Sequence, residues 1–343
     1  LSAPHPTIEN ISLVWSLTGD TDGDSQVLVR YRPQGTVTWR SGMPLRRVPA
    51  GSGDGGFVWT YRHAGSLFDL QPGTTYEIEA QLVDPDGGSE PRTITATTRT
   101  VPSAMAGAPV KPAAPGTLDA VLGSAQPGDI VLLAAGLYDG FQIGVSGEPG
   151  RPIVVRNGGG AVVNGEIGIF LQHDVHVEGL TVNGRIRFNG TDRTSITGNT
   201  INAKPENEGH GIITYLRAED AYIADNVVNG VTAWNDSALG ASGNNLGEGI
   251  LVTGPGHVIE HNRVSGVRDA ISFVEDTGAF DQFSIDVLDN EILNAADDGI
   301  EADFCFHNCR IMRNRLTNTF VALSAQPTLG GPTYFVRNIA YNV

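Results

Sequence analysis

The sequence predicts an all-β protein in two parts, a β-sandwich followed by a right-handed parallel β-helix. Up to about residue 98, short alternating segments are separated by Gly, Pro and Asp turns, which is the pattern of a sandwich. From residue 196 onward, one short sequence motif with a central asparagine repeats. The chain has 44 glycines and 19 prolines in 343 residues, so turns are frequent and long helices are not expected.

The expected sandwich strands alternate apolar and polar positions, as half-buried strands do. They are the segments 11–15, 27–31, 36–39, 56–61, 75–82 and 93–97. Trp15 lies on an early segment, and residues 70–76 read Leu-Gln-Pro-Gly-Thr-Thr-Tyr, a motif that places a corner tyrosine. On these residues, 1–98 resembles a fibronectin type III module. The resemblance implies a spacer or a binding platform, and it assigns no chemistry.

The start of the second part is expected to be capped. Residues 99–115 are rich in Pro and Ala and have the composition of a linker. Residues 117–125 predict a short amphipathic helix with Thr117 as its N-cap, and an open solenoid end needs such a cap. This opening resembles that of secreted polysaccharide lyases and epimerases built on β-helices. The β-helix is therefore placed at 116–343.

The repeat is the strongest signal for the β-helix. Successive asparagines are 27, 36, 28, 24 and 24 residues apart, which are solenoid periods in which one unit buries its apolar face only by stacking on the next. An asparagine amide can donate and accept along such a stack while tolerating the left-handed turn between strands. The last copy ends without a capping segment, which predicts truncation at the C-terminus. The asparagines are Asn199, Asn226, Asn262, Asn290, Asn314 and Asn338.

Charge and hydropathy argue against two classes of partner. The net charge is −16, and Lys111 and Lys204 are the only lysines among 22 basic residues, so no basic stripe could neutralise nucleic acid. No stretch reaches the ~18 apolar residues of a membrane span. The chain does not begin with Met, which fits a removed leader or a trimmed sequence. We expect a secreted protein, extracellular or periplasmic, of unspecified oligomeric state.

The two cysteines leave an alternative open. Cys305 and Cys309 are too few for a disulfide framework and lack the paired spacing of a structural zinc site. They would form a small-loop disulfide in an oxidising compartment, or they would remain as two half-buried thiols.

A second sequence motif in successive coils contains an acidic residue or a histidine. Aligning the coils, with 231–247 treated as a loop insertion, places His210, Glu248, Asp269 and Asp298 in one column. Neighbouring strands lie ~4.8 Å apart, so these groups would crowd along one face. Like charges at that spacing take up protons or hold a cation. A rim of solvated turn residues is the alternative interpretation of the same column.

One segment of this column suggests calcium. Residues 297–301 read Asp-Asp-Gly-Ile-Glu and follow Asp269 by one coil. They resemble the calcium-dependent β-helix pectate lyases, one group of which has Asp-Asp-Gly-x-Asp one coil after a single Asp. The resemblance implies that Asp269, Asp297, Asp298 and Glu301 hold calcium, which takes six to eight oxygen ligands at ~2.3–2.6 Å.

The chain departs from that group at the catalytic base. The group removes a proton with a lysine on a later coil, where the alignment here puts Leu323. Other β-helix lyases use an arginine, and Arg268, Arg217 and Arg313 are candidates. An arginine base needs a strongly cationic setting, because its pKa exceeds ~12. These arginines are otherwise salt-bridge partners of the acids.

Hydrolysis is an alternative that needs no metal. Carboxylates ~5 Å apart suit a retaining glycosidase, and a pair ~6.5–9.5 Å apart suits an inverting one, so Asp298 could work with Asp269 or Glu248. Polygalacturonase-type hydrolases share the fold and combine aspartates with Gly-His-Gly. Here the Gly-His-Gly around His210 precedes the acids instead of following them.

Two loops are expected to form the sides of a binding groove. The insertion 231–247 contains Trp234, which could stack on a sugar ring or simply pack. The segment 275–281 begins with Glu275 and would form the opposite wall. Trp234, Arg217 and Glu275 are the candidate substrate-binding residues.

The sequence therefore predicts a protein that acts on a polysaccharide. The main expectation is calcium-assisted β-elimination of a uronic-acid polymer, because calcium would bridge an acidic protein to an acidic substrate and acidify the α-proton. The alternatives are hydrolysis by paired carboxylates on adjacent coils, C5-epimerisation, and a non-catalytic binding or surface protein. The candidate catalytic residues are Asp298, Asp269, Glu248, His210 and Arg268.

Overall fold

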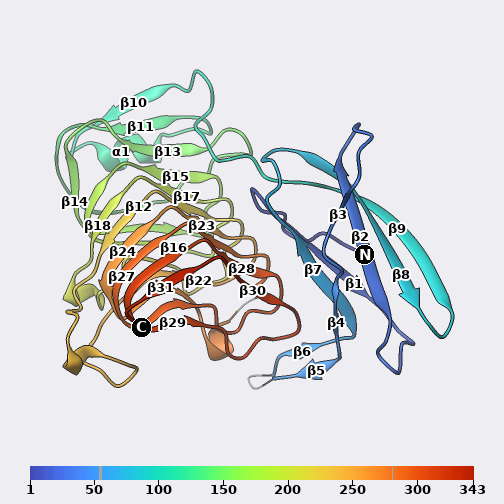
Figure 1. Ribbon diagram of the computed structural model, residues 1–343. Helices are drawn as coiled ribbons and strands as arrows, with labels where there is room; N and C mark the ends of the chain where they lie inside the picture. The colour runs from blue at the N-terminus through green and yellow to red at the C-terminus, as the bar shows by residue number, and fades with distance from the viewer. Residues whose placement is uncertain (54–55, 280) are drawn as a thin grey trace.

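The computed structural model describes residues 1–53, 56–279 and 281–343. These residues form two bodies that lie side by side, a sandwich and a stack of parallel coils (Figure 1). The structure is nearly all β, as the sequence predicts, and its fold class is confirmed. Among the described residues, no helix is long and apolar enough to cross a bilayer.

The N-terminal body is a sandwich of two antiparallel sheets around one core that contains Ile11, Trp15 and Ile78. The hydroxyl of Tyr76 accepts a hydrogen bond from the main-chain N–H of Gln71 at 2.9 Å. The resemblance to a fibronectin type III module stays a prediction. One sheet contains β1 (Ile11–Ser16), β7 (Arg62–Leu67) and β4 (Arg46–Val48). The other contains β3 (Arg40–Ser41), β2 (Gln26–Pro33), β8 (Thr75–Asp84) and β9 (Gly88–Thr97), and β5 (Gly51–Ser52) pairs with β6 (Val58–Trp59).

The second body is the parallel β-helix, and its first long sheet has ten strands. The first of these strands lies inside the segment 99–115, so part of the expected linker already belongs to the opening coil. The strands are β10 (Val110–Ala113), β11 (Ile130–Leu133), β13 (Ile153–Asn157), β15 (Val175–Glu178), β17 (Ser195–Thr197), β20 (Tyr222–Ala224), β23 (Val258–Glu260), β26 (Asp286–Leu288), β28 (Cys309–Met312) and β30 (Thr333–Val336).

The other long sheet has twelve strands, ten along one path of neighbours and two off this path. They are β12 (Gly136–Ile143), β14 (Ala161–Phe170), β16 (Thr181–Asn189), β18 (Thr200–Asn202), β21 (Val227–Asn229), β24 (Arg263–Val267), β27 (Glu291–Glu301), β25 (Asp269–Phe273), β22 (Glu248–Val252), β19 (Ile212–Ile213), β29 (Arg315–Ser324) and β31 (Ile339–Tyr341). Because β27 has 11 residues, its first half pairs with β24 and its last residues pair with β25. Short 3₁₀ turns lie in the loops at η2 (Pro205–Asn207), η3 (Asp236–Ala238) and η4 (Asp276–Gly278).

A short helix covers the open N-terminal end of the coils. Helix α1 (Leu118–Gly123) buries Leu118 and Leu122 against the core. The prediction that Thr117 caps it through its side chain is wrong, since the hydroxyl makes no cap hydrogen bond. That hydroxyl instead accepts from the N–H of Ala114 at 2.9 Å, which closes the turn before the helix.

The asparagine ladder is confirmed. The amide of Asn226 donates to the side-chain oxygen of Asn262 at 2.9 Å, and the amide of Asn262 donates to that of Asn290 at 3.0 Å. The same oxygens also accept main-chain N–H groups of the preceding coil. One expectation is wrong: the left-handed position belongs to the residue before the asparagine, for example Asp225 at φ 58° and His261 at φ 55°.

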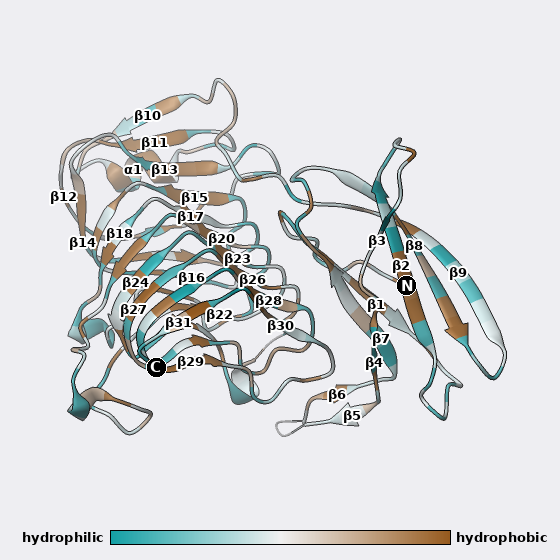
Figure 2. Cartoon of the chain, viewed as in Figure 1, coloured by the Kyte–Doolittle hydropathy of each residue, from teal (hydrophilic) through white to brown (hydrophobic). Residues whose placement is uncertain are grey.

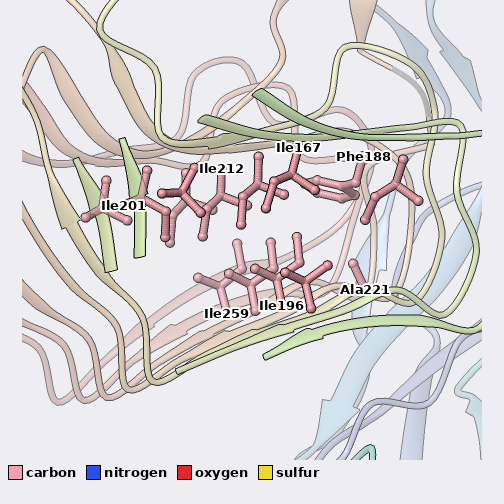
Figure 3. Packing of buried hydrophobic residues seen from close by; sticks show 14 of the residues in the cluster. Ile167, Phe188, Ile196, Ile201, Ile212, Ala221 and Ile259 are labelled. Carbon is pink, nitrogen blue, oxygen red and sulfur yellow. The ribbon is translucent and has the colours of Figure 1, made fainter. Parts of the chain in front are cut away.

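Apolar side chains fill the space between the two long sheets. Hydrophobic positions alternate along the strands and line up from coil to coil (Figure 2). Ile201 and Ile212 point inward from the twelve-stranded sheet toward Ile196 and Ile259 of the ten-stranded sheet (Figure 3). All four side chains are fully buried. This core fixes which residues of each coil must face outward.

The sandwich contacts a buried ion pair of the ten-stranded sheet. Arg310 on β28 pairs with Asp286 on β26, and both side chains are fully buried. Hydroxyl and amide groups of the sandwich form further hydrogen bonds with both side chains, and Nη2 of Arg310 has no partner among the described residues. The sandwich partners are Thr7 and Asn10 for Asp286, and Ser12 and Ser66 for Arg310.

A second contact involves the loops after β25 and β27. Phe57 of the sandwich packs against Phe304 and Phe306, with ring centroids 6.2 and 5.1 Å apart. Cys305, between these two aromatics, forms a disulfide with Cys309, which settles the alternative left open by the sequence. The sandwich thus supports loops that border the acid column described next.

Candidate functional site

The coil register places the predicted column at one edge of the twelve-stranded sheet. Ile212, Ile250, Ile271 and Ile300 lie opposite one another in successive coils. The residues two positions earlier are His210, Glu248, Asp269 and Asp298, and Glu248 is the direct partner of Asp269. Adjacent parallel strands lie ~4.8 Å apart. Carboxylates of three successive coils therefore lie next to one another.

Three aspartates of this column form a compact group, here called the acid cluster: Asp269, Asp297 and Asp298. Each side chain offers an oxygen, and these oxygens lie within 4.8 Å of one another. Their exposed fractions are 2%, 6% and 9%. The main-chain N–H of Asp298 donates to Oδ1 of Asp269 at 2.8 Å, but Oδ1 of Asp298 is buried and has no hydrogen-bond partner among the described residues. The cluster is thus enclosed and incompletely satisfied.

A single arginine faces the acid cluster. Nε of Arg268 lies 3.3 Å from Oδ2 of Asp269, and Nη2 lies 3.5 Å from Oδ2 of Asp297. The first contact lacks hydrogen-bond geometry, and the arginine side chain is 42% exposed. Burial lowers the pKa of Arg268, but Asp269 and Glu248 outweigh it and raise that pKa. A guanidinium held this firmly in its charged form is a counter-charge and a poor proton acceptor.

The carboxyl groups at this edge resist ionisation. Burial, and then the charge of Asp269, raises the pKa of Asp298 to about 7 and that of Glu301 to about 9. Burial likewise raises the pKa of Asp269, and burial followed by the neighbouring Asp269 raises that of Glu248. These shifts come first from burial, and the neighbouring carboxylates add to them at Glu248, Asp298 and Glu301.

This acid cluster fits a hard cation. Calcium prefers several carboxylate oxygens in one place, and the acid cluster provides them within 4.8 Å. The partnerless oxygen of Asp298 is an open ligand position. A second group, Glu275, Glu301 and Asp303, also brings its oxygens within 4.8 Å, so Glu301 lies between two sets of acids.

A pocket of about 150 Å³ opens between these groups. Its lining includes Glu248, Arg268, Asp269, Glu275 and Glu301, together with Tyr215. The hydroxyl of Ser272 donates to Oε2 of Glu248 at 2.6 Å, which fixes the direction of this carboxyl group. Five of the predicted site residues therefore border one cavity.

Tyr215 is a residue that the sequence analysis missed. The main-chain N–H of Glu248 donates to Nδ1 of His210 at 3.0 Å, so the neutral ring carries its hydrogen on Nε2. Nε2 lies 3.0 Å from the hydroxyl oxygen of Tyr215 and can donate to it. The tyrosine proton is then left to point elsewhere. The only sequence signal was position, because Tyr215 lies five residues after His210 in the same coil.

His210 and Tyr215 are both neutral at neutral pH. Burial lowers the pKa of His210. Burial raises the pKa of Tyr215, and the nearby Glu248 raises it further. The pair can therefore hold and donate a proton next to the acids, with the tyrosine hydroxyl as the group that borders the pocket.

Two of the predicted substrate-binding residues, Trp234 and Arg217, do not line this pocket. The insertion 231–247 does lie beside the acid column, since Gly240 N–H donates to the carbonyl of Ala296 and Arg268 N–H to that of Leu246. Trp234 within it is half-buried and does not line the pocket. Arg217 pairs with Glu219 and Asp281, which removes it from the acids.

The loop 275–281 does reach the site through Glu275. Phe280 in this loop lies outside the described residues. Leu323 pairs with Ile300 in the next coil. Lys111 pairs with Asp129, and Lys204 approaches Glu206, so the described structure offers no lysine at the pocket. Arg313 pairs with Asp289 near the sandwich.

No family model and no curated protein matches the chain. Among the solved structures that match, two show the following weak similarity. An alginate lyase from Paenibacillus sp. str. FPU-7 aligns with a TM-score of 0.40 and 16% identity, over 68% of this chain and 98% of that one. A family 28 exopolygalacturonase from Yersinia enterocolitica aligns with a TM-score of 0.37 and 11% identity, over 99% of this chain and 85% of that one. We assign no activity from either.

Proposed function

We propose that the protein cleaves an acidic, uronic-acid polysaccharide by calcium-assisted β-elimination. The observation that carries this proposal is the charge imbalance of the acid cluster. Three buried aspartates with oxygens within 4.8 Å of one another face one half-exposed arginine, and one carboxylate oxygen has no partner among the described residues. Burying such charges without compensation is costly, and a bound cation would remove that cost.

Asp269, Asp297, Asp298 and Glu301 would hold the calcium. Bound there, calcium would attract a substrate carboxylate and make the adjacent α-proton more acidic. In β-elimination a base takes this α-proton, the bond from the β-carbon to the glycosidic oxygen breaks, a carbon–carbon double bond forms, and the leaving oxygen takes a proton. Two proton transfers are therefore needed in addition to the cation.

The pocket provides candidates for both transfers. Glu248 borders the pocket and its carboxyl is oriented by Ser272. Its raised pKa makes its carboxylate a better proton acceptor than an ordinary glutamate. Tyr215 stays protonated and is oriented by His210, so we assign it as the donor to the leaving oxygen. Arg268 then balances charge and contributes no proton transfer.

Hydrolysis by paired carboxylates is a second candidate, favoured by one specific observation. Glu248 and Asp269 are direct partners on adjacent strands, which lie ~4.8 Å apart, close to the ~5 Å of retaining glycosidases. Both pKa values are raised, so one group could be a protonated acid while the other is ionised. A C5-epimerase and a non-catalytic binding protein are further outcomes that the experiment below separates.

We also propose that the protein works outside the cytoplasm. The disulfide between Cys305 and Cys309 supports an oxidising compartment, and a polysaccharide substrate is consistent with that setting. The sandwich is proposed to be a fibronectin type III-like module, on the strength of the hydrogen bond between Tyr76 and Gln71.

The test is product analysis on pectate, alginate, glycosaminoglycans and neutral glucans, with and without a chelator. β-Elimination gives an unsaturated product that absorbs in the ultraviolet, and the chelator abolishes it. Reducing ends without that absorbance would establish hydrolysis, and a changed C5 configuration without cleavage would establish epimerisation. Binding without any product would reduce the site to a calcium-dependent binding site.

Asp298→Asn is the variant that tests the site itself. It should lower turnover by about 100-fold or more, since it removes both charge and a ligand oxygen. Asp192→Asn is the matched control, because Asp192 is a half-buried aspartate of another coil edge that pairs with Arg193. Full activity of Asp298→Asn would remove the assignment.

A further inference from the structure

We propose that Arg185 and Arg187 form a carboxylate-binding subsite for an acidic polysaccharide, on the same outer face as the acid cluster. This inference rests on the proposed function and names the part of the protein that would select an acidic chain. It is based on the outward direction of the two arginines, on their two positive charges beside one carboxylate, and on their place in the coil register.

Both arginines face outward from β16. Ile186 and Phe188, which alternate with them, are fully buried in the core, so the side chains of Arg185 and Arg187 must lie on the other face of the strand. They remain 17% and 30% exposed. Their guanidinium groups are thus accessible to a ligand that lies along the outer face.

Both arginines share one carboxylate. Nε of Arg185 donates to Oε2 of Glu166 at 2.6 Å, and Nη2 and Nε of Arg187 donate to Oε1 at 2.6 and 3.1 Å. Two cations against one anion leave a net positive charge at this point of a protein whose overall charge is −16. An acidic polymer would be attracted here and repelled by most of the remaining surface.

The guanidinium groups keep free donors in a fixed direction. Each guanidinium has five N–H donors, and Glu166 uses one of Arg185 and two of Arg187. The described residues supply no other hydrogen bond to either group. Arg187 also lies over the ring of Phe170, with its central carbon 4.9 Å from the ring centroid. Such stacking holds the fork in place, which favours bidentate binding of a carboxylate.

The register connects this pair to the pocket. Arg187 pairs with Ile213, Ile213 with Leu251, and Leu251 with Ser272. Leu251 and Ser272 line the acid pocket. With one coil every ~4.8 Å, the arginine lies about 14 Å from Ser272 along the axis. A polysaccharide lying along the axis would pass Tyr215, whose pKa both arginines lower against the dominant effect of burial.

A purely structural role would predict a neutral pair, and the chain contains one for comparison. Arg156 on β13 donates to Oε2 of Glu178 on β15 at 2.7 Å. That pair also joins adjacent coils, but it has one arginine for one carboxylate, with Nδ1 of His176 3.7 Å from Oε1 of Glu178, and it lies on the ten-stranded sheet. Arg156 is therefore the matched control for the loss of an outward arginine that bridges two coils.

The experiment measures binding of oligogalacturonates and oligomannuronates of increasing length by calorimetry with calcium present, in the Glu248→Gln background, which removes the proposed base and keeps every proposed calcium ligand. Arg187→Gln and Arg185→Gln should each weaken binding of the longer oligomers by about 10-fold, since charge-assisted hydrogen bonds are lost. Dimers, too short to reach the pair from the pocket, and carboxyl-reduced oligomers should bind equally to all variants. Arg156→Gln should behave as the parent does.

Equal affinity of long oligomers for Arg185→Gln, Arg187→Gln and the parent would overturn the subsite. So would an equal loss for neutral oligomers. If Arg187→Gln lowers the unfolding midpoint, Arg185→Gln, which leaves the stack on Phe170 intact, decides the question. The proposed function can fail separately. Arginine-dependent binding without any product from the wild type would keep the subsite and reject the lyase. Cleavage with an unchanged KM in both arginine variants would keep the lyase and reject the subsite.

Discussion

Two sets of buried charges in this molecule differ in how they are balanced. Between the sandwich and the coils, Asp286 and Arg310 are fully buried and paired with each other, and four polar groups of the sandwich form further hydrogen bonds with them. At the edge of the twelve-stranded sheet, three nearly buried aspartates of the acid cluster share one half-exposed arginine. Both sets lie on adjacent coils of the same solenoid.

The difference shows that burial of charge is not by itself a sign of function. Asp286 and Arg310 each have a partner of opposite sign and further hydrogen bonds, as a structural pair requires. In the acid cluster three carboxylates share Arg268, and burial together with the neighbouring carboxylates raises the pKa of Asp298 to about 7 and that of the adjoining Glu301 to about 9. The imbalance, and not the burial, points to a ligand.

The largest expected effect lies at the balanced pair. Arg310→Met leaves Asp286 buried without its counter-charge, and removing one partner of a buried pair costs about 3–5 kcal/mol. Urea unfolding should report this loss. Arg313→Gln is the control, because Arg313 also joins the two bodies but is 26% exposed, and exposed pairs contribute about 1 kcal/mol or less. Equal losses in both variants would contradict the distinction drawn here.

Calcium should act on the unbalanced set alone. At a concentration 100 times its Kd, calcium should raise the free energy of unfolding by about 2.7 kcal/mol, and Asp298→Asn should remove this gain. Asp24→Asn is the control, because Asp20, Asp24 and Asp84 form the third acidic group with oxygens within 4.8 Å, in the sandwich. A gain that vanishes in Asp24→Asn but persists in Asp298→Asn would relocate the site.

The asparagine ladder offers a neutral buried set for comparison. Asn262→Ala removes an oxygen that accepts both the main-chain N–H and the amide of Asn226. Leaving a buried donor unsatisfied costs about 1–3 kcal/mol, and chemical denaturation should show it. Calcium affinity should not change. A loss of calcium binding would mean that the ladder and the acid cluster are coupled more tightly than the register alone requires.

The pH dependence of the free energy of unfolding should also distinguish the two charged sets, with a smaller effect than the variants above. Without divalent cations, the folded state keeps protons on Asp298 and Glu301 up to about pH 7 and 9, while the unfolded chain releases them near pH ~4. Their contribution is therefore present below the unfolded pKa and is lost as pH rises through the folded values. Asp298→Asn should flatten this decline by roughly 1–2 kcal/mol. An unchanged slope would contradict the raised pKa values.

Much of this arrangement could be predicted from sequence because a solenoid is nearly one-dimensional. The spacing of Asn199, Asn226 and Asn262 fixes the coil register, and the register brings Glu248, Asp269 and Asp298 together without any knowledge of distant contacts. The roles of these residues stay predictions. The disulfide between Cys305 and Cys309 is local too, but sequence spacing alone could not choose between bonded and free thiols.

The contacts that the sequence did not reveal are those that depend on side-chain direction or on the other body. Arg310 follows Cys309 as an ordinary strand residue, and only the docked sandwich buries it. Tyr215 follows a short β19, and its place at the pocket depends on its bond to His210. Trp234 was singled out by residue type alone, and its loop carries it beside the pocket instead of into its lining.

The most direct test of the central claim is a calorimetric titration of calcium at pH 7, carried out in two buffers with different ionisation enthalpies. Calcium should bind at the acid cluster and release protons, because Asp298 and Glu301 have raised pKa values and must ionise to become ligands. Both the binding and the proton release should disappear in Asp298→Asn. Binding without proton release, or equal binding by wild type and Asp298→Asn, would contradict the claim that the unbalanced carboxylates form the cation site.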